Sequence, residues 1–548
     1  MTGQAMVRWP VFVGESRAQA GIEARRYGVP PAMIEAAIER RSAGDWRGAC
    51  AAANVECFFD PGTIRRRCGA EVAGALLDDL RTLAPDLLRW HLPRYAHGSG
   101  RLLAGLLVPL AEYGGAGTGF TLAAATPGFA LKAGERIVLT LLETGSCGAR
   151  SGADAGVNAV LQAVHRRRAE RYDLRRYRMF WDAACAMGLR ELCGDAVGGA
   201  AILRLQDEGR AAEAWTAAGF EVTLGSSRAT PEEQRRLARW LSSLPVNLPG
   251  LAQRVSDALP AADEAVIRCG SGALVLSGLN GGTTAVEVAA SRSVRARGAV
   301  LPEIPYAVWS RPLDADLFRL GLVETRDLHP LVGAAIADSA AERAEPDGWR
   351  YSTESGIEAQ YADSVSSGAG NTVVLVRCGA GLHRVARVDG RWQPIDHDDH
   401  PAREALLQRL GGPVNPCRVA AQHLGSGRHV IDAVARFLDH GRVAEAARLL
   451  ETHGDSGTAP GDFVLADGVT VGERLADLRE HTLRLRMTRA GTPPVRDVQS
   501  SRAATPAWGY LDLRFRRTQY FRKTRASRLK GITRRSRKGE SARLKKHR

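Results

Sequence analysis

The sequence predicts a helix-dominated α+β protein with several domains, two β-meander segments and a disordered basic C-terminal tail. Three observations support this fold class. The chain has 548 residues, more than a single hydrophobic core usually serves. Apolar residues make up 45% of it and charged residues 25%, which is ordinary for a globular protein. Helical spacing of apolar residues dominates, and strand-like runs gather in groups instead of alternating with helices as in a doubly wound sheet.

The expected organisation has five parts. Residues 1–113 are expected to be helical, 114–260 to hold a short β and loop segment followed by helices, 261–395 to contain β-meanders with intervening helices, 396–486 to be helical, and 487–548 to form a linker and the basic tail. The linker is expected at 487–506 because this stretch is rich in Thr, Ser, Pro and Arg.

Short helices are expected in the first part, because apolar residues such as Met33 and Ala37 recur at helical spacing while Gly28 and Gly44 interrupt the pattern. The expected helices span 18–27, 30–42, 45–53 and 69–83. In the second part, β-rich runs are expected at 120–125 and 136–142, followed by one long helical stretch from 157 to about 205.

Two segments are expected to be β-meanders. In the first, strands at 265–269, 273–276 and 283–289 are separated by Gly-Ser-Gly and Asn-Gly-Gly, which are strong turn signals. The second runs from 372 to 395, with turns at Gly379-Ala380-Gly381 and Asp389-Gly390. Helices are expected again from 401 to about 486.

Three short segments resemble one another. Each has a helix break at Gly44, Gly209 or Gly441, with an alanine five residues later. Small residues of this kind let two helices approach closely, which is typical of helical hairpins of tetratricopeptide type and of peptide-binding solenoids. True solenoids repeat at a fixed period in adjacent copies, and these copies are far apart and irregularly spaced, so we favour three unrelated hairpins.

The last 35 residues carry a charge equal to the net charge of the whole chain. From Arg514 to Arg548 there are 16 Lys/Arg and one acid, Glu540, giving +15, which is also the net charge of all 548 residues. Lysine, scarce elsewhere in an Arg-rich composition typical of a GC-rich genome, occurs six times, and only Lys132 precedes this tail. A concentrated cationic arm predicts an anionic partner.

Nucleic acid is the partner that we favour for the tail, because phosphate neutralisation needs charge density and no fixed fold. The alternatives are an anionic membrane surface, an acidic protein, or a translated out-of-frame end. The expected phosphate contacts are Arg516, Arg517, Arg522, Lys523, Arg534, Arg535, Arg537 and Lys538.

The densest group of metal-ligand residues is Asp396-His397-Asp398-Asp399-His400. Of these, His397, Asp398 and His400 are candidate ligands for zinc or another divalent cation in a hydrolase or nuclease. Five adjacent residues rarely aim three side chains at one point, and the cluster also suits the capped start of a helix at Pro401. We favour the capping interpretation.

Two stretches combine arginine with aromatic residues. Arg89, His91, Arg94, Tyr95 and His97 could line a pocket for an anionic group, although such residues are also common at helix ends. Arginines between 166 and 178, interleaved with tyrosines, are expected on a helix that either binds nucleic acid or, in the interpretation we favour, forms an amphipathic surface with its aromatic edge in the core.

The sequence gives little indication of a membrane span, a signal peptide, a cysteine-based site or a phosphate-binding loop. The longest apolar run, 102–110, is too short to span a membrane, and residues 1–15 do not have the pattern of a signal peptide. The nine cysteines are scattered without a Cys-x-x-Cys pair, which fits a reducing cytoplasm. The glycine-rich 114–119 matches no phosphate-loop motif.

We therefore expect a non-enzymatic binding or scaffold protein of the bacterial cytoplasm. Its basic arm would contact nucleic acid or another polyanion without strong sequence preference, and its body would recognise a protein. The alternatives are the metal-dependent hydrolase or nuclease at Asp396–His400 and a protein-interaction module built on the helical hairpins. No cofactor and no catalytic residue can be assigned from the sequence.

Overall fold

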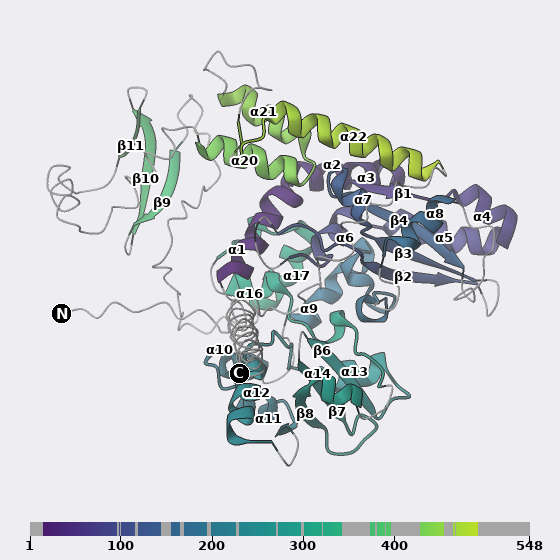
Figure 1. Cartoon of the computed structure of the whole chain (residues 1–548), viewed down its shortest axis with the longest axis vertical. Coiled ribbons are helices and arrows are strands. Elements are labelled where there is room, and N and C mark those ends of the chain that lie inside the picture. Colours follow the sequence, from purple (N-terminus) through teal and green to yellow (C-terminus); the bar gives the residue numbers. More distant parts are fainter. Residues whose placement is uncertain are drawn as a thin grey trace, which may run out of the picture. The chain divides into compact units, whose positions relative to one another are not determined.

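A computed structural model describes the protein in two compact units (Figure 1). The first unit contains Glu15–Val197 and Pro305–Asp497, and the second contains Gly198–Ile304. The described residues are 15–95, 98, 100–114, 119–143, 155–164, 169–193, 199–225, 229–269, 272–296, 301–319, 322–341, 373–378, 381–388, 391–395, 428–453, 464–465 and 467–490. The expected tail therefore lies outside the described residues, and the five-part domain division stays a prediction.

The described chain is helix-rich, with two four-stranded mixed sheets. In the first unit the sheet has the order β1-β4-β3-β2. The chain leaves β1 at one edge, crosses through three helices to β2 at the other edge, and returns by antiparallel β3 to β4, which runs parallel to β1. Its elements are α2 (Pro31–Ser42), α3 (Trp46–Ala52), β1 (Val55–Cys57), α4 (Pro61–Cys68), α5 (Ala70–Thr82), α6 (Pro85–His91), β2 (Leu107–Tyr113), β3 (Phe120–Ala125), α7 (Gly128–Lys132), β4 (Ile137–Glu143) and α8 (Ala155–Gln162).

The second unit repeats this connectivity. Its sheet has the order β5-β8-β7-β6, with β5 parallel to β8 and the other pairs antiparallel. A pair of helices precedes its first strand, as in the first unit. Its elements are α10 (Gly199–Asp207), α11 (Ala211–Ala217), β5 (Glu221–Leu224), α12 (Pro231–Ser242), α13 (Leu251–Ala258), β6 (Glu264–Cys269), β7 (Gly272–Ser277), β8 (Ala285–Ala290) and α14 (Ser291–Ala296).

The three hairpins share one turn. Gly44, Gly209 and Gly441 have φ of 74°, 77° and 71°, the left-handed conformation that glycine adopts at low cost. In each turn the glycine N–H donates to the carbonyl three residues earlier, and the next N–H donates to the carbonyl five residues before it. All three segments are helical hairpins with this same backbone turn, and the first two precede the first strands of the two four-stranded sheets. The interpretation that the three hairpins are unrelated stays a prediction.

The remaining helices of the first unit come from the N-terminal segment before α2 and from the sequence after α8. They are α1 (Glu15–Glu23), the π-helical turn η1 (Ala24–Gly28), η3 (Glu170–Tyr172), η4 (Arg178–Phe180), η5 (Ala183–Gly188), α9 (Leu189–Leu192), α15 (Tyr306–Trp309), α16 (Leu313–Arg319), η6 (Thr325–Asp327), α17 (Pro330–Ala341), α20 (Arg428–Asp439), α21 (Val443–His453) and α22 (Val471–Arg489). The predicted meander at 372–395 is confirmed as β9 (Val373–Cys378), β10 (Gly381–Val388) and β11 (Arg391–Pro394).

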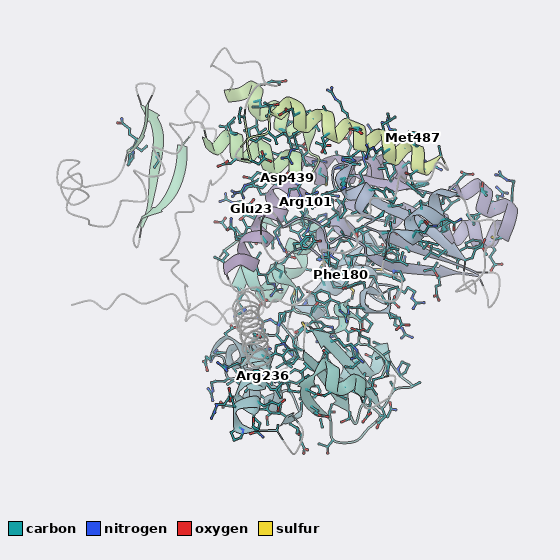
Figure 2. All side chains as sticks on the ribbon, in the orientation of Figure 1. Glu23, Arg101, Phe180, Arg236, Asp439 and Met487 are labelled. Atoms are coloured by element: carbon teal, nitrogen blue, oxygen red, sulfur yellow. The ribbon has the colours of Figure 1, made fainter. Side chains whose placement is uncertain are left out.

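The third hairpin, α20 and α21, packs against the N-terminal helices (Figure 2). Arg436 on α20 forms an ion pair with Glu23 on α1, and Phe437 packs edge-on against Tyr27 at a centroid distance of 5.0 Å. Asp439 at the end of α20 pairs with Arg474 on α22 at 3.2 Å. The first two contacts join segments more than 400 residues apart in the sequence.

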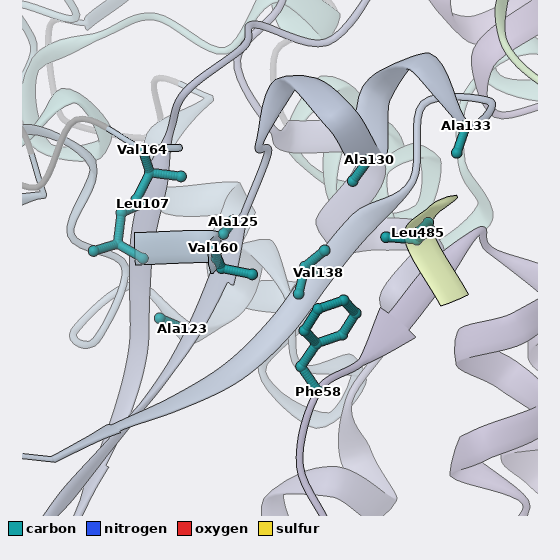
Figure 3. Close-up of a cluster of buried hydrophobic side chains, with 10 residues drawn as sticks. All are labelled: Phe58, Leu107, Ala123, Ala125, Ala130, Ala133, Val138, Val160, Val164 and Leu485. Atoms are coloured by element: carbon teal, nitrogen blue, oxygen red, sulfur yellow. The ribbon is translucent and has the colours of Figure 1, made fainter. Parts of the chain in front are cut away.

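One hydrophobic core of the first unit joins the sheet to α22 (Figure 3). Val138 on β4, Phe58 just after β1 and Ala130 on α7 meet Leu485 on α22, which is 1% exposed. Burial of such side chains is worth about 1.5–3 kcal/mol each for the larger ones, so α22 is an integral part of this unit.

One expectation for the first part and one for the second part were wrong. The strand β2 was missed because its apolar run contains Pro109; both of its faces are largely buried, and a bulge between Pro109 and Ala111 accommodates the proline at the sheet edge. The continuous helix expected at 157–205 is instead divided into separate short elements, α8, η3, η4, η5, α9 and α10. The Leu174 N–H donates to the Pro109 carbonyl and the Ala84 N–H to the Trp181 carbonyl, so tertiary pairing replaces helical hydrogen bonds there.

Among the helices of the described residues, none combines the length and the apolar character that crossing a membrane requires.

Candidate functional site

The short helix α6 carries charged and polar side chains that are buried. Its seven residues begin with Pro85, which suits a first helical position, and end before Leu92-Pro93. Asp86 and Arg89 are both 0% exposed, and Trp90 is 7% exposed. A buried charge is costly unless it is paired, so each of these side chains must have a partner. We call these residues, with His91 and their partners, the α6 cluster.

Asp86 pairs with a histidine from a distant segment. His329 Nε2 lies 2.9 Å from Asp86 Oδ2, and both side chains are 0% exposed. The Leu331 N–H donates to His329 Nδ1 at 3.3 Å, so Nδ1 is the acceptor and Nε2 carries the proton donated to Asp86. Arg41 on α2 approaches Asp86 Oδ1 at 3.5 Å. Both ring nitrogens are thus occupied.

Trp90 and Arg25 share a second carboxylate. The Trp90 indole N–H lies 3.2 Å from both oxygens of Asp314, and Arg25 Nε donates to Asp314 Oδ1 at 2.8 Å. The Arg25 guanidinium also lies over the Trp90 ring, 5.1 Å from its centroid, in cation–π geometry. This group joins α16 and η1 to α6.

Arg89 anchors the third and largest group. Its Nε donates to the Gly28 carbonyl at 3.0 Å, its Nη1 donates to the Glu135 carbonyl, and its Nη2 lies 3.3 Å from Glu135 Oε2. Glu135 Oε2 also accepts from His440 Nδ1 at 2.6 Å, and Oε1 accepts from the Leu102 N–H at 2.7 Å. The partly exposed Arg101 approaches the same carboxylate at 3.5 Å (Figure 2).

These charges alter the pKa values of the group. Burial alone would raise the pKa of Glu135, but the adjacent His440 and the Arg89 and Arg94 charges outweigh it and hold that pKa well below its usual range. Burial lowers the pKa of Arg89 to about 9, against the opposing effect of Glu135. The pair is therefore ionised at neutral pH.

The backbone turn at Gly134 and Glu135 packs closely against the turn of the third hairpin. Glu135 has φ of 52° and Gly134 has φ of 87°, so the turn before β4 is left-handed at both residues. A Cβ on Gly134 would lie 2.9 Å from the Cα of Gly441, which shows how closely the two turns pack. Next to Gly441, His440 binds Glu135, and Arg442 reaches the Ala52 carbonyl at 3.5 Å.

His91 is the exception in the cluster, because its shielded Nε2 has no hydrogen-bond partner in the described structure. Its ring packs edge-on against Phe180 at 4.9 Å (Figure 2). Burial, with Arg25 and His329 nearby, lowers the pKa of His91 to about 3 despite the opposing charge of Asp314. The imidazole is therefore neutral at physiological pH.

The α6 cluster holds the fold together and does not have the arrangement of an active site. Asp86–His329 and Glu135–His440 are carboxylate–histidine pairs like those that orient a catalytic base. In both pairs the side chains are 0% exposed, and the nitrogens of His329 are already hydrogen-bonded, so this ring cannot accept a proton from a substrate. The Asp86–His329 pair instead joins α6 to a segment 243 residues away, and the Glu135–His440 pair joins the turn before β4 to the residue after α20, 305 residues later.

The structure uses the predicted anion-binding residues in other ways. Arg89 is fully buried against Glu135, and Arg94 donates to the carbonyls of Arg89 and Gly100. His97 lies outside the described residues. The proposed pocket is thus replaced, for Arg89 and Arg94, by internal hydrogen bonds.

Two arginines of the second basic stretch are paired with carboxylates. Arg178 binds Asp79 and Asp182, both at 2.6 Å, and Arg175 binds Asp173 and Glu112. Trp181 is 0% exposed, so the favoured interpretation of an aromatic edge in the core is confirmed for this residue, although the segment is not one helix. Residues 165–168 lie outside the described residues.

The other predicted sites cannot be placed. The metal candidates His397, Asp398 and His400 and all eight basic tail residues, from Arg516 to Lys538, lie outside the described residues. Within the part of the chain that the structure describes, no group of three or more His, Cys, Asp or Glu side chains is arranged to hold a metal ion. The metal site and the tail contacts stay predictions.

Sequence reasoning missed Glu135, Asp314, His329 and His440. Two signals were present. The sequence Ala133-Gly-Glu-Arg136 places a charged residue directly after a glycine, before a strand, and a histidine, His440, directly precedes the turn glycine Gly441. Neither signal identifies the partner, because pairing depends on the tertiary fold.

Comparison with known proteins gives no relative for this chain: no family model, no curated protein and no solved structure matches it.

Proposed function

We propose that this protein is a non-enzymatic binding or scaffold protein whose basic C-terminal arm, residues 514–548, contacts nucleic acid without strong sequence preference. The observation that carries the proposal is the segregation of charge: the arm holds +15, and residues 1–513 contain 59 basic and 59 acidic residues. Contacts to phosphates depend mainly on such local charge density. The neutral body would recognise a protein partner.

The ion pairs of the body support the assignment of nucleic-acid binding to the arm and not to the body. Buried Arg89 and Arg25 are bound to carboxylates, and the partly exposed Arg175 and Arg178 are each bound to two. An arginine held in this way has fewer donors left for phosphate. The arm has one acid among 16 basic residues, so most of its charges have no neighbouring carboxylate in the sequence.

The proposal is tested with two full-length variants of equal charge. In the arm variant, four basic residues are changed to Gln: Arg534, Arg535, Arg537 and Lys538. In the control variant, four exposed helical arginines of the body are changed to Gln: Arg65, Arg235, Arg239 and Arg486. Affinity for labelled single-stranded RNA and duplex DNA of random sequence is measured by fluorescence anisotropy at several salt concentrations.

The slope of log K against log salt is negative. Loss of four phosphate contacts reduces its magnitude by up to ~3.6 for duplex DNA and by somewhat less for single strands. We expect this reduction in the arm variant, with a slope close to that of the parent in the control variant. Equal affinity and equal slope in the parent and the arm variant would refute the proposal. A larger loss in the body variant than in the arm variant would move the binding site to the body.

A further inference from the structure

Two cysteines of the first unit face each other across the contact between α3 and β1. Trp46 at the start of α3 stacks on Phe59, just after β1, with ring planes 5° apart and centroids 6.4 Å apart. Cys50 lies four residues after Trp46, about 6 Å further along the helix. Cys57 lies two residues before Phe59, about 6.6 Å back along the extended chain. The distances from Trp46 to Cys50 along the helix and from Phe59 to Cys57 along the extended chain are similar. The Trp46–Phe59 stack therefore places Cys50 opposite Cys57.

The contacts between α3 and β1 agree with this register, and both cysteines are free thiols. Cys50 is 1% exposed, whereas Cys57 is half-buried. The neighbouring Cys57 thiol and then burial raise the pKa of Cys50 above its ordinary value. Cys57 is therefore the more accessible thiol, and the Cys50 thiol is buried.

We propose that Cys50 and Cys57 form an oxidisable dithiol that peroxide converts into an intrachain disulfide. A disulfide in a reducing compartment is usually transient and redox-sensing, and a redox-sensor cysteine usually lies next to a second thiol that resolves it. This site is independent of nucleic-acid binding by the arm.

The chemistry uses hydrogen peroxide as the oxidant. The Cys57 thiolate attacks one peroxide oxygen, the O–O bond breaks, and Cys57 sulfenic acid and hydroxide form. The Cys50 sulfur then attacks the sulfenic sulfur, the S–S bond forms, and the S–O bond breaks with loss of hydroxide. The two thiol protons convert both hydroxides to water, so two thiols and one peroxide give one disulfide and two waters. A small-molecule dithiol returns two electrons and restores the thiols.

The position of Cys57 gives the disulfide a structural consequence. Glu56, immediately before it, forms ion pairs with Arg136 and with Arg489 on α22. Phe58, immediately after it, packs with Leu485 of α22 in the core. A covalent bond at Cys57 therefore acts on the strand that holds α22.

The test uses the full-length protein, hydrogen peroxide and mass spectrometry. No Lys or Arg lies between Arg47 and Arg65, so one tryptic peptide, 48–65, contains both cysteines. Oxidation is expected to lower the mass of this peptide by two hydrogens, and cleavage after Glu56 is expected to give two fragments that separate only after reduction. Dithiothreitol is expected to reverse the change.

Single variants identify the roles of the two thiols. Cys57→Ser is expected to slow oxidation of the 48–65 peptide by at least about tenfold, because Cys50 is shielded. Cys50→Ser is expected to leave a Cys57 sulfenic acid that dimedone traps. Cys68→Ser, at a half-buried cysteine on α4, is the matched control and should leave the disulfide yield unchanged. Circular dichroism checks that each variant is folded.

The proposal is overturned if Cys50 and Cys57 both stay reduced while Cys68 or another cysteine reacts. It is equally overturned if Cys57 forms its disulfide with a cysteine other than Cys50.

Discussion

Replacing Gly441 by alanine, compared with the same change at Gly44, isolates the docking of the third hairpin. The two glycines occupy the same turn, with φ of 71° and 74°. A Cβ at Gly44 would meet nothing within 4 Å, whereas a Cβ at Gly441 would lie 2.5 Å from the carbonyl oxygen and 2.7 Å from the carbonyl carbon of Gly134. The backbone strain is therefore the same at both positions, and only the contact differs.

The magnitude follows from these distances. An alanine with left-handed φ costs about 1–2 kcal/mol at either position. At Gly441 the obstructing atoms are backbone, so the turn must move by most of an ångström, and the His440–Glu135 hydrogen bond of 2.6 Å is stretched. Disturbing a buried charged pair of this kind costs up to about 3–5 kcal/mol when it is broken outright. We expect Gly441→Ala to destabilise by about 3–5 kcal/mol and Gly44→Ala by about 1–2 kcal/mol.

Urea denaturation of the two full-length variants measures the difference, and hydrogen exchange locates it. In Gly441→Ala, the peptides of α20 and α21 should lose protection more than those of α2 and α3. In Gly44→Ala the loss should stay in α2 and α3. Equal destabilisation within about 0.5 kcal/mol, the usual limit of additivity between independent sites, would show that the Gly134–Gly441 contact does not hold the hairpin.

Two further predictions concern the α6 cluster. Glu135→Gln keeps the size of the side chain but leaves Arg89 buried without its counter-charge, so a loss of about 3–5 kcal/mol is expected in urea denaturation; Glu480→Gln, at an exposed pair on α22, should change stability by less than about 1 kcal/mol. His91→Phe should flatten the pH dependence of stability. The pKa of His91 is lowered to about 3, so between pH 3 and the ordinary value near 6.5 the unfolded chain binds a proton that the folded chain does not, and stability falls as pH falls through this window by up to about 1.4 kcal/mol per pH unit. A variant that retains the parent slope would contradict the shielding of His91.

The sequence predicted the elements whose signals are local. The strand β3 was predicted at its observed bounds, and β6 to β8 within two residues, because glycine-rich turns separate short apolar runs. The strands β1 and β5 were missed. They have three and four residues, and each pairs in parallel with a strand more than 60 residues later. Such short strands depend on their partners, which a local pattern cannot reveal.

The α6 cluster could not be predicted for a similar reason. Asp86, Arg89 and His91 look like solvent-exposed residues of a polar segment, and burial of charged residues is unusual. Arg89 and Asp86 are buried against partners 46 and 243 residues away, Glu135 and His329, and Glu135 in turn pairs with His440, 305 residues later. The sequence pattern around Arg89 and His91 therefore left a pocket for an anionic group open as an alternative, whereas in the structure Arg89 joins α6 to Glu135.

The shared hairpin turn shows how the same backbone takes on different structural roles. Gly44 is followed by Asp45, whose carboxylate accepts from the Gly48 N–H and caps α3. Gly441 is flanked by His440 and Arg442, which bind Glu135 and the Ala52 carbonyl. The turn geometry alone does not select a docking partner, because it is the same in both hairpins. The flanking side chains do, and they make the third hairpin a structural part of a unit whose sheet lies some 300 residues earlier in the chain.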